Sequence, residues 1–201
     1  MKKRPIRMIA LLLTVSLLSA GAAACSGGAS AAREIYISSF AEDGGDGSRE
    51  KPYNTLSVIE KLDITKGTHI YLERGSHFYG SLVLSDISGS GKAPVVVSAY
   101  GEGDRPRIDG NDLTGSGILR IANCSNLIVE ELELYDSAPE EGDRRGVLIT
   151  CDAPEGSQEV VTYENITLRN LYIHDINGHR DAENSGMATW SKKTGGIQLW
   201  S

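Results

Sequence analysis

The sequence has few basic residues relative to its acidic ones. Lys and Arg number 20 and Asp and Glu 27 in a chain of 201 residues. Four of the basic residues lie within the first seven positions, so the remainder carries a formal charge of 16 − 27 = −11. This balance argues against nucleic acid as the partner, because phosphates need a basic surface. It also disfavours a polyanionic substrate, unless a basic patch or bound cations offset the repulsion.

Cysteine is scarce as well, with three in the chain, of which Cys124 and Cys151 lie outside the N-terminal segment. The sequence has no CxxC and no HxxxH, so it lacks the usual spacing of metal ligands. For Cys124 and Cys151 two alternatives stay open: two small buried side chains, or a disulfide, which an exported protein allows. A nucleophile elbow, a P-loop and a dinucleotide fingerprint are also missing.

The apolar run Ile9–Leu18 is too short to span a bilayer comfortably. It follows a basic start and precedes Ala22-Ala23-Ala24-Cys25, which predicts a bacterial-type secretory signal over residues 1–24. The Ala-Ala-Ala-Cys end resembles a lipoprotein cleavage box, although Ala22 stands where that box usually has Leu. The resemblance implies a lipidated Cys25, a tether over residues 25–33 and anchoring to the outside of a bacterial cell envelope. The alternatives are ordinary secretion after cleavage at a nearby Ala, and an uncleaved anchor.

A segment at 126–137, NLIVEELELYDS, recurs at 165–176 as NITLRNLYIHDI, at an offset of 39 residues. Apolar residues occupy alternate positions, which is typical of a strand. The alternation slips once, between Val129 and Leu132 and at the matching place in the second copy. Such a slip turns the chain onto a new face, so each copy is predicted to be two short strands that meet at a corner. A repeated bent strand pair indicates a coil of stacked rungs, each burying the inward row of its neighbour.

Further short alternating pairs recur at intervals of 28 and then 50 residues, namely Leu119/Ile121, Val147/Ile149 and Ile197/Leu199. The excess of 22 residues divides equally between two loops, within 152–163 and 177–196. The length of the rung core is therefore constant, and the extra residues lie in two longer loops. Such insertions often lie on the binding face of a repeat protein.

The segment 51–62, KPYNTLSVIEKL, predicts a short amphipathic helix before the rungs begin. Leu56, Ile59 and Leu62 share one helical face, and Asn54 or Thr55 is placed to cap its start. A coil of rungs needs a cover over its first apolar end, so we expect this helix to be the N-terminal cap.

Three stretches carry a resemblance to a known family: GDGSREKPYNTL at 45–56, THIYLERGSHFYGSLVL at 68–84 and KAPVVVSAYGEGDRPRIDG at 92–110. They resemble the opening of right-handed parallel β-helix proteins of the pectin-lyase-like superfamily. The expected fold is therefore all-β, a right-handed parallel β-helix (solenoid) over residues 34–201 with about four or five rungs. The fold hosts lyases, hydrolases, epimerases and proteins without a catalytic role, so it identifies no single reaction.

The resemblance, together with export, implies action on an extracellular polysaccharide as a polysaccharide lyase or a glycoside hydrolase. The alternative is a non-catalytic carbohydrate-binding or cell-envelope surface protein. No protein partner can be inferred. The chain stops at Ser201 as a rung begins, so we expect it to be the N-terminal part of a longer β-helix, inactive alone, with catalytic residues that belong to later rungs.

Asp136 and Asp175 occupy equivalent places in the two copies of the repeat. If their backbones are one strand spacing apart, the carboxylates repel, and one gains a proton or a cation binds between them. Calcium suits a cluster of oxygen ligands and bridges acidic sugars in several members of the superfamily. The alternative is that each side chain bonds the amides of its own turn. No other cofactor is indicated.

His174 is expected to point outward in register with Tyr135, either stacked on it or lining a sugar-binding surface with Asp175. The following loop, NGHRDAENSGMATWSKKTGG, is long for a compact domain, and long loops are often functional. A stretch of the form IHDINGH…GGI resembles the loop of large β-helix glycosidase-like proteins of gut bacteria. Trp190 offers an apolar face to a sugar, and His179 and Arg180 add polar groups. The alternative is a solvated insertion, and no residue in the loop is assigned as acid, base or nucleophile.

Overall fold

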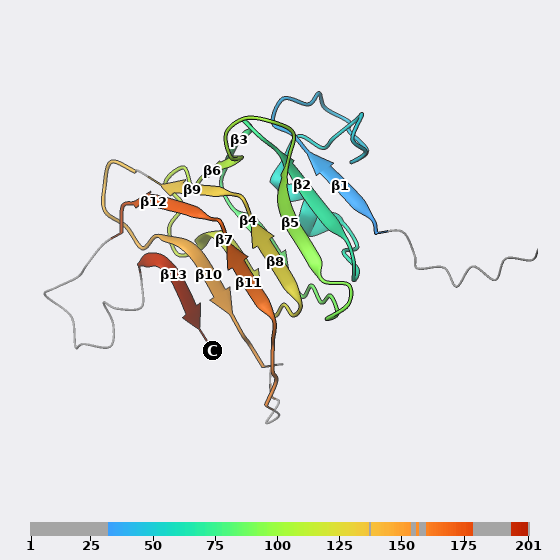
Figure 1. Cartoon of the computed structure of the whole chain (residues 1–201). Coiled ribbons are helices and arrows are strands. Elements are labelled where there is room, and N and C mark those ends of the chain that lie inside the picture. Colours follow the sequence, from blue (N-terminus) through green and yellow to red (C-terminus); the bar gives the residue numbers. More distant parts are fainter. Residues whose placement is uncertain (1–31, 137, 154–155, 157–159, 179–193, 201) are drawn as a thin grey trace, which may run out of the picture. The chain divides into compact units, whose positions relative to one another are not determined.

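The computed structural model describes residues 32–136, 138–153, 156, 160–178 and 194–200. Thirteen strands and one short 3-10 helix lie within these residues (Figure 1). The first seven elements are β1 (Glu34–Ile37), η1 (Leu56–Lys61), β2 (His69–Glu73), β3 (His77–Tyr79), β4 (Leu82–Ser85), β5 (Val95–Tyr100) and β6 (Arg107–Asp109). The others are β7 (Gly117–Ala122), β8 (Leu127–Glu130), β9 (Glu133–Asp136), β10 (Arg145–Thr150), β11 (Ile166–Arg169), β12 (Tyr172–Ile176) and β13 (Gly195–Trp200).

The strands form three parallel sheets that the chain visits in turn. Sheet A has the order β1-β2-β5-β8-β11, sheet B β12-β9-β6-β3 and sheet C β13-β10-β7-β4. From β2 onward, each set of three consecutive strands contributes one strand to each sheet, so four rungs stack and β1 adds a fifth strand to sheet A. Figure 1 shows β8 and β11 side by side in sheet A, and β9 and β12 side by side in sheet B. The expected parallel β-helix is confirmed.

The predicted repeat registers as expected. Leu127 of β8 pairs with Ile166 of β11, and Val147 of β10 pairs with both Leu119 of β7 and Ile197 of β13. The slip in the alternation is a corner, because Glu131 and Asn170 have φ values of 61° and 52°. One left-handed residue between two strands redirects the chain onto the next sheet.

The inward rows form one apolar core. In sheet A, Ile35, Ile70, Val97 and Val129 follow one another across four strands, and each is at most 3% exposed. Leu168 continues this row and is partly buried. Complete burial of such a side chain contributes about 1.5–3 kcal/mol. The stack is therefore stabilised mainly by its apolar rows.

The helix η1 is a 3-10 helix that packs against β4, and Leu56 and Ile59 are buried. Thr55 precedes its first residue but makes no side-chain capping hydrogen bond; its hydroxyl instead lies 2.9 Å from that of Ser57. The amide of Asn54 donates to Asp43. The predicted side-chain cap is thus wrong, because both candidate side chains have other partners. Within the described residues, no helix is both long and apolar enough to cross a membrane.

Candidate functional site: the outer face of sheet B

Two outward rows cross all four strands of sheet B. His77, Arg107, Glu133 and Tyr172 form one row, and Tyr79, Asp109, Tyr135 and His174 form the other. They alternate with an inward row of Phe78, Ile108, Leu134 and Ile173. We call these eight outward residues the sheet B face. Period-two alternation places them all outside, so the face combines aromatic rings, carboxylates and cationic groups.

The centre of the face is a chain of charge contacts. Arg107 Nε lies 2.8 Å from Glu133 Oε1, and the same oxygen lies 3.0 Å from His174 Nε2. The other ring nitrogen of His174, Nδ1, lies 2.9 Å from Asp175 Oδ2. A carboxylate between two cationic groups fixes the orientation of both side chains.

The protonation of His174 follows from these contacts. Partial burial lowers the pKa of His174, but the hydrogen bonds to Asp175 and Glu133 and their charges outweigh it, so the pKa is raised above its usual value. Both ring nitrogens face carboxylates, which favours the doubly protonated ring. In that form the ring donates to both carboxylates and orders them, and it is poorly suited to accept a proton from a substrate.

The rings of the face pack on one another and on the cations. Tyr172 stacks on His174 with centroids 4.2 Å apart, and Tyr135 lies 5.1 Å from the same ring. The guanidinium of Arg107 lies over Tyr135, with Cζ 4.3 Å from the centroid. At the opposite edge, Tyr79 packs on His77 at 4.6 Å. Tyr79 and Tyr172 remain 65% and 52% exposed, so each presents ring surface to solvent at one edge of the sheet.

Two parts of the prediction for His174 are confirmed. The residue pairs with Tyr135 in register, and its ring packs on that of Tyr135. Asp175 lies beside it. His179, Arg180 and Trp190 lie outside the described residues, so their part in a binding loop stays a prediction. The sequence reasoning missed Arg107, Glu133 and Tyr172. The 39-residue offset was the available signal, since it places Tyr172 beside Glu133.

The expected pairing of Asp136 with Asp175 is wrong. A bulge in β12 sets Ile176, and not Asp175, opposite Asp136. Asp175 has a φ of 47°, and its side chain is 66% exposed, whereas that of Asp136 is 1% exposed. The extra residue reverses the direction of one side chain, so the two carboxylates do not face each other as expected. Among the described residues, no group of three His, Cys, Asp or Glu is placed to hold a metal ion.

Asp136 belongs instead to a buried charge cluster at the end of β9. Its Oδ1 lies 3.6 Å from Nε of Arg144, which is only 2% exposed. Arg144 also forms an ion pair with Asp112 and donates to the carbonyl oxygens of Glu140 and Asn177, at 2.7 and 3.0 Å. Burial raises the pKa of Asp136, and the charge of Arg144 opposes that shift. The cluster ties the loop before β10 to the neighbouring rungs.

Cys124 and Cys151 are both free in the structure. Cys124 is buried, and burial raises the pKa of its thiol. Cys151 is half-buried. Of the two alternatives considered for the pair, the structure therefore has the free thiols, with only Cys124 fully buried.

No family model matches the chain. Two curated proteins do: lacto-N-biosidase of Bifidobacterium longum subsp. longum, 26% identical over 191 residues, and pectate lyase PEL9 of Emericella nidulans, 31% identical over 154 residues. These matches cover 72% and 70% of this chain but only 12% and 34% of those proteins. The chain therefore spans about a third or less of the length of the curated relatives it matches.

A solved structure is similar throughout most of the chain. The crystal structure of GH136 lacto-N-biosidase from Eubacterium ramulus superposes with a TM-score of 0.67 and 28% sequence identity. The match covers 83% of this chain and 30% of that one. This likeness and the three parallel sheets agree with the resemblance found in the sequence.

Proposed function

We propose, from the premise that the chain is a right-handed parallel β-helix protein of the pectin-lyase-like superfamily, that it belongs to an enzyme acting on extracellular polysaccharide or oligosaccharide. Its relatives are named as a glycosidase and a pectate lyase. In this proposal the sheet B face binds the sugar chain. The observation that carries it is the ordered polar face itself, in which Arg107, Glu133 and His174 are joined across three rungs and aromatic rings flank the charged groups.

The chemistry of the face suits a sugar. An exposed tyrosine ring offers a flat apolar surface with a polar tip, and the carboxylates of Asp109 and Glu133 between the two edges accept hydrogen bonds from hydroxyl groups. Arg107 is already paired with Glu133 at 2.8 Å, and His174 with two carboxylates. Few cationic groups are therefore left for an acidic sugar, and we favour an uncharged glycan and hydrolysis over elimination.

A second candidate is a non-catalytic wall that only holds the glycan. The engagement of both ring nitrogens of His174 favours it, because that side chain has no free site for proton transfer. In this case the acid and base of hydrolysis, or the base of a lyase, come from other residues.

Three expectations from the sequence complete the proposal. Cys25 is lipid-modified after removal of residues 1–24, which anchors the protein outside a bacterial cell. Residues 56–61, as η1, cover the first rung of the coil; burial of Leu56 and Ile59 supports this. Calcium remains a candidate ligand without assigned residues. Mass spectrometry of the mature N-terminus tests the first, and a terminus that starts at any residue other than Cys25 refutes it.

Incubating the complete protein with a panel of polysaccharides and oligosaccharides tests the activity. We expect new reducing ends without ultraviolet absorbance, which is the result of hydrolysis. Unsaturated products that absorb in the ultraviolet would replace hydrolysis by lyase chemistry, and binding without products would favour the non-catalytic wall. If no glycan is bound or cleaved, the proposed function is wrong.

A further inference from the structure

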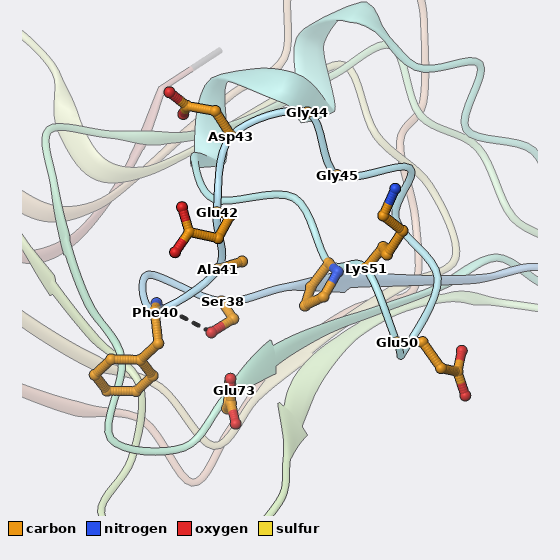
Figure 2. A pocket seen from close by; sticks show the side chains of 11 residues that line it. Ser38, Phe40, Ala41, Glu42, Asp43, Gly44, Gly45, Glu50, Lys51 and Glu73 are labelled. Carbon is orange, nitrogen blue, oxygen red and sulfur yellow. Dashed lines mark hydrogen bonds between the residues drawn. The ribbon is translucent and has the colours of Figure 1, made fainter.

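A hollow of about 430 Å³ lies against sheet A, under the loop that joins β1 to η1. Ser38 follows β1 and Glu73 ends β2, and the loop residues Phe40, Glu42, Glu50 and Lys51 line its wall (Figure 2). We call this site the β1–β2 hollow. Its strands belong to sheet A, and its lining shares no residue with the sheet B face, although the two are neighbours: the amide of His77 donates to Ser39 Oγ at 3.0 Å.

The loop over the hollow is held in place by its own backbone. Ser38 N donates to the carbonyl of Tyr53 at 2.8 Å, and Gly47 N donates to that of Lys51 at 3.0 Å. Gly45 packs so closely that a Cβ there would lie 2.0 Å from the carbonyl oxygen of Pro52. Ser38 Oγ accepts from the amide of Phe40 at 3.1 Å. The hollow is thus formed before a ligand arrives, which reduces the entropy lost on binding.

Several groups in the hollow have no partner of their own. Within the described residues, no hydrogen bond or ion pair engages the side-chain ends of Glu42, Glu50 or Lys51. Phe40 is 68% exposed, so its ring is open to solvent. Figure 2 shows the ring of Phe40 on the same side of Ser38 as Glu42. An open ring, two acceptors and one donor around a preformed hollow are the groups that a ligand with many hydroxyls uses.

Glu73 is oriented by an aromatic cluster on the outer surface of sheet A. Tyr100 Oη donates to Glu73 Oε2 at 3.4 Å. Burial, together with the charge of Glu73, raises the pKa of Tyr100 to about 12, so the hydroxyl stays protonated and remains a donor. Tyr36 packs edge-on against Tyr100 at 5.0 Å and stacks on Tyr71 at 5.3 Å. Tyr100 thus holds the carboxylate that lines the hollow.

Charge and geometry narrow the ligand class. The lining has four carboxylates, of Glu42, Asp43, Glu50 and Glu73, against the single ammonium of Lys51, which disfavours acidic sugars and other anions. A divalent cation is disfavoured because no three His, Cys, Asp or Glu among the described residues are grouped to hold one. Asp43 already accepts from Asn54 at 2.7 Å.

We propose that the β1–β2 hollow is a second saccharide site, which binds one or two units of an uncharged glycan against Phe40. Glu42 and Glu73 accept hydrogen bonds from its hydroxyls, and Lys51 donates one. This inference depends on the proposed function only for the class of ligand, an uncharged glycan. The hollow binds that glycan at a second point, outside the sheet B face, and catalyses no reaction.

Nitrogen-15 NMR of the full chain carrying Leu199→Lys, the substitution expected to favour the monomer, separates the two sites. We would titrate it with three uncharged disaccharides (lacto-N-biose, cellobiose and chitobiose), with trigalacturonate and with calcium chloride. We expect at least one disaccharide to shift the amides of Gly44, Gly45 and Lys51 in a saturable way, and trigalacturonate to leave them unchanged. Phe40→Ala should weaken this binding by about tenfold or more, equivalent to about 1.4 kcal/mol. Tyr79→Ala, which removes a similarly exposed ring from the sheet B face, should not.

The outcomes distinguish the two proposals. If only the amides around Tyr172 and His174 shift, the second site is wrong and the proposed function stands. Shifts confined to the hollow support the second site and count against the sheet B face. If calcium alone shifts the amides of the hollow, or if Phe40→Ala leaves the disaccharide shifts unchanged, the inference is overturned.

Discussion

Glu133 on β9 and His174 on β12 are joined across neighbouring rungs, with Oε1 and Nε2 3.0 Å apart. The same carboxylate oxygen contacts Arg107 on β6, so one side chain connects three consecutive rungs. Parallel strands lie about 4.8 Å apart, which allows a side chain of this length to reach both neighbours. The order of the sheet B face depends on this link.

Glu133→Gln should lower the pKa of His174. The substitution removes one of the two carboxylates that raise this pKa, and leaves Asp175 in place. NMR titration of the imidazole carbon protons measures the shift. Glu60→Gln, which changes an exposed carboxylate on η1 beside sheet C, should leave it unchanged. An equal pKa in wild type and Glu133→Gln would contradict the contact.

The same contact predicts how the stability of the fold changes with pH. Because the folded-state pKa of His174 is raised, its contribution is fully present below the unfolded value of about 6.5 and is lost as pH rises through the folded pKa. Urea unfolding of wild type and His174→Gln should therefore differ most at pH 5.5 and converge toward pH 9. A difference that grows with pH would oppose this assignment.

Arg144→Met should destabilise the protein by about 3–5 kcal/mol, because it leaves Asp136 buried without its cation. The double variant Arg144→Met, Asp136→Asn should recover a substantial part of that loss, since no buried charge then remains unpaired. Arg120→Met replaces an exposed arginine on sheet C and should change the free energy of unfolding little. Urea unfolding measures all three. A loss under 1 kcal/mol for Arg144→Met would contradict the role of the cluster.

The corner asparagines give a matched pair of substitutions. Asn165 Nδ2 donates to Asn126 Oδ1 at 3.0 Å, and both residues are left-handed, with φ values of 58° and 53°. Asn165→Gly keeps a residue that adopts the left-handed conformation without strain but loses the hydrogen bond, which should lower the free energy of unfolding by about 1 kcal/mol. Asn165→Ala should cost about 1 kcal/mol more, because Ala disfavours the left-handed region. Equal thermal stability of the two variants would contradict the backbone argument.

The exposed apolar residues of β13 should make the isolated chain associate. Ile197 and Leu199 are 58% and 64% exposed, and β13 is an edge strand of sheet C. Exposed strand edges with apolar side chains pair with other chains. Light scattering should show oligomers for residues 26–201, and Leu199→Lys should shift them toward monomer. A monodisperse monomer of the unmodified chain would refute this.

The rung geometry could be predicted from the sequence because both signals can be found in the order of residues alone. Period-two alternation marks the strands, and the constant offset sets which residues pair in neighbouring rungs. Leu127 pairs with Ile166 as that offset requires. The same offset places Asn165 next to Asn126, and their side chains are hydrogen-bonded in the structure.

The candidate site could be predicted only in part. Asp175 is displaced by a bulge, and no glycine marks it, so the alternation gave no sign that one residue lies outside the register. Arg107 stands on a strand of three residues, too short for alternation to reveal which side chains face outward. Burial of Arg144 depends on partners that are far apart in sequence, Asp112 and Asn177, which a local pattern cannot locate.

The central claim is that the sheet B face binds glycan through its edge tyrosines, and calorimetric titration of the complete protein with its best-bound uncharged oligosaccharide tests it most directly. The double substitution Tyr79→Ala, Tyr172→Ala should weaken binding by about tenfold or more, equivalent to about 1.4 kcal/mol. Tyr79→Phe, Tyr172→Phe keeps both rings and should retain most of the affinity. If the alanine variant binds as tightly as wild type while remaining folded, the sheet B face is not the glycan site.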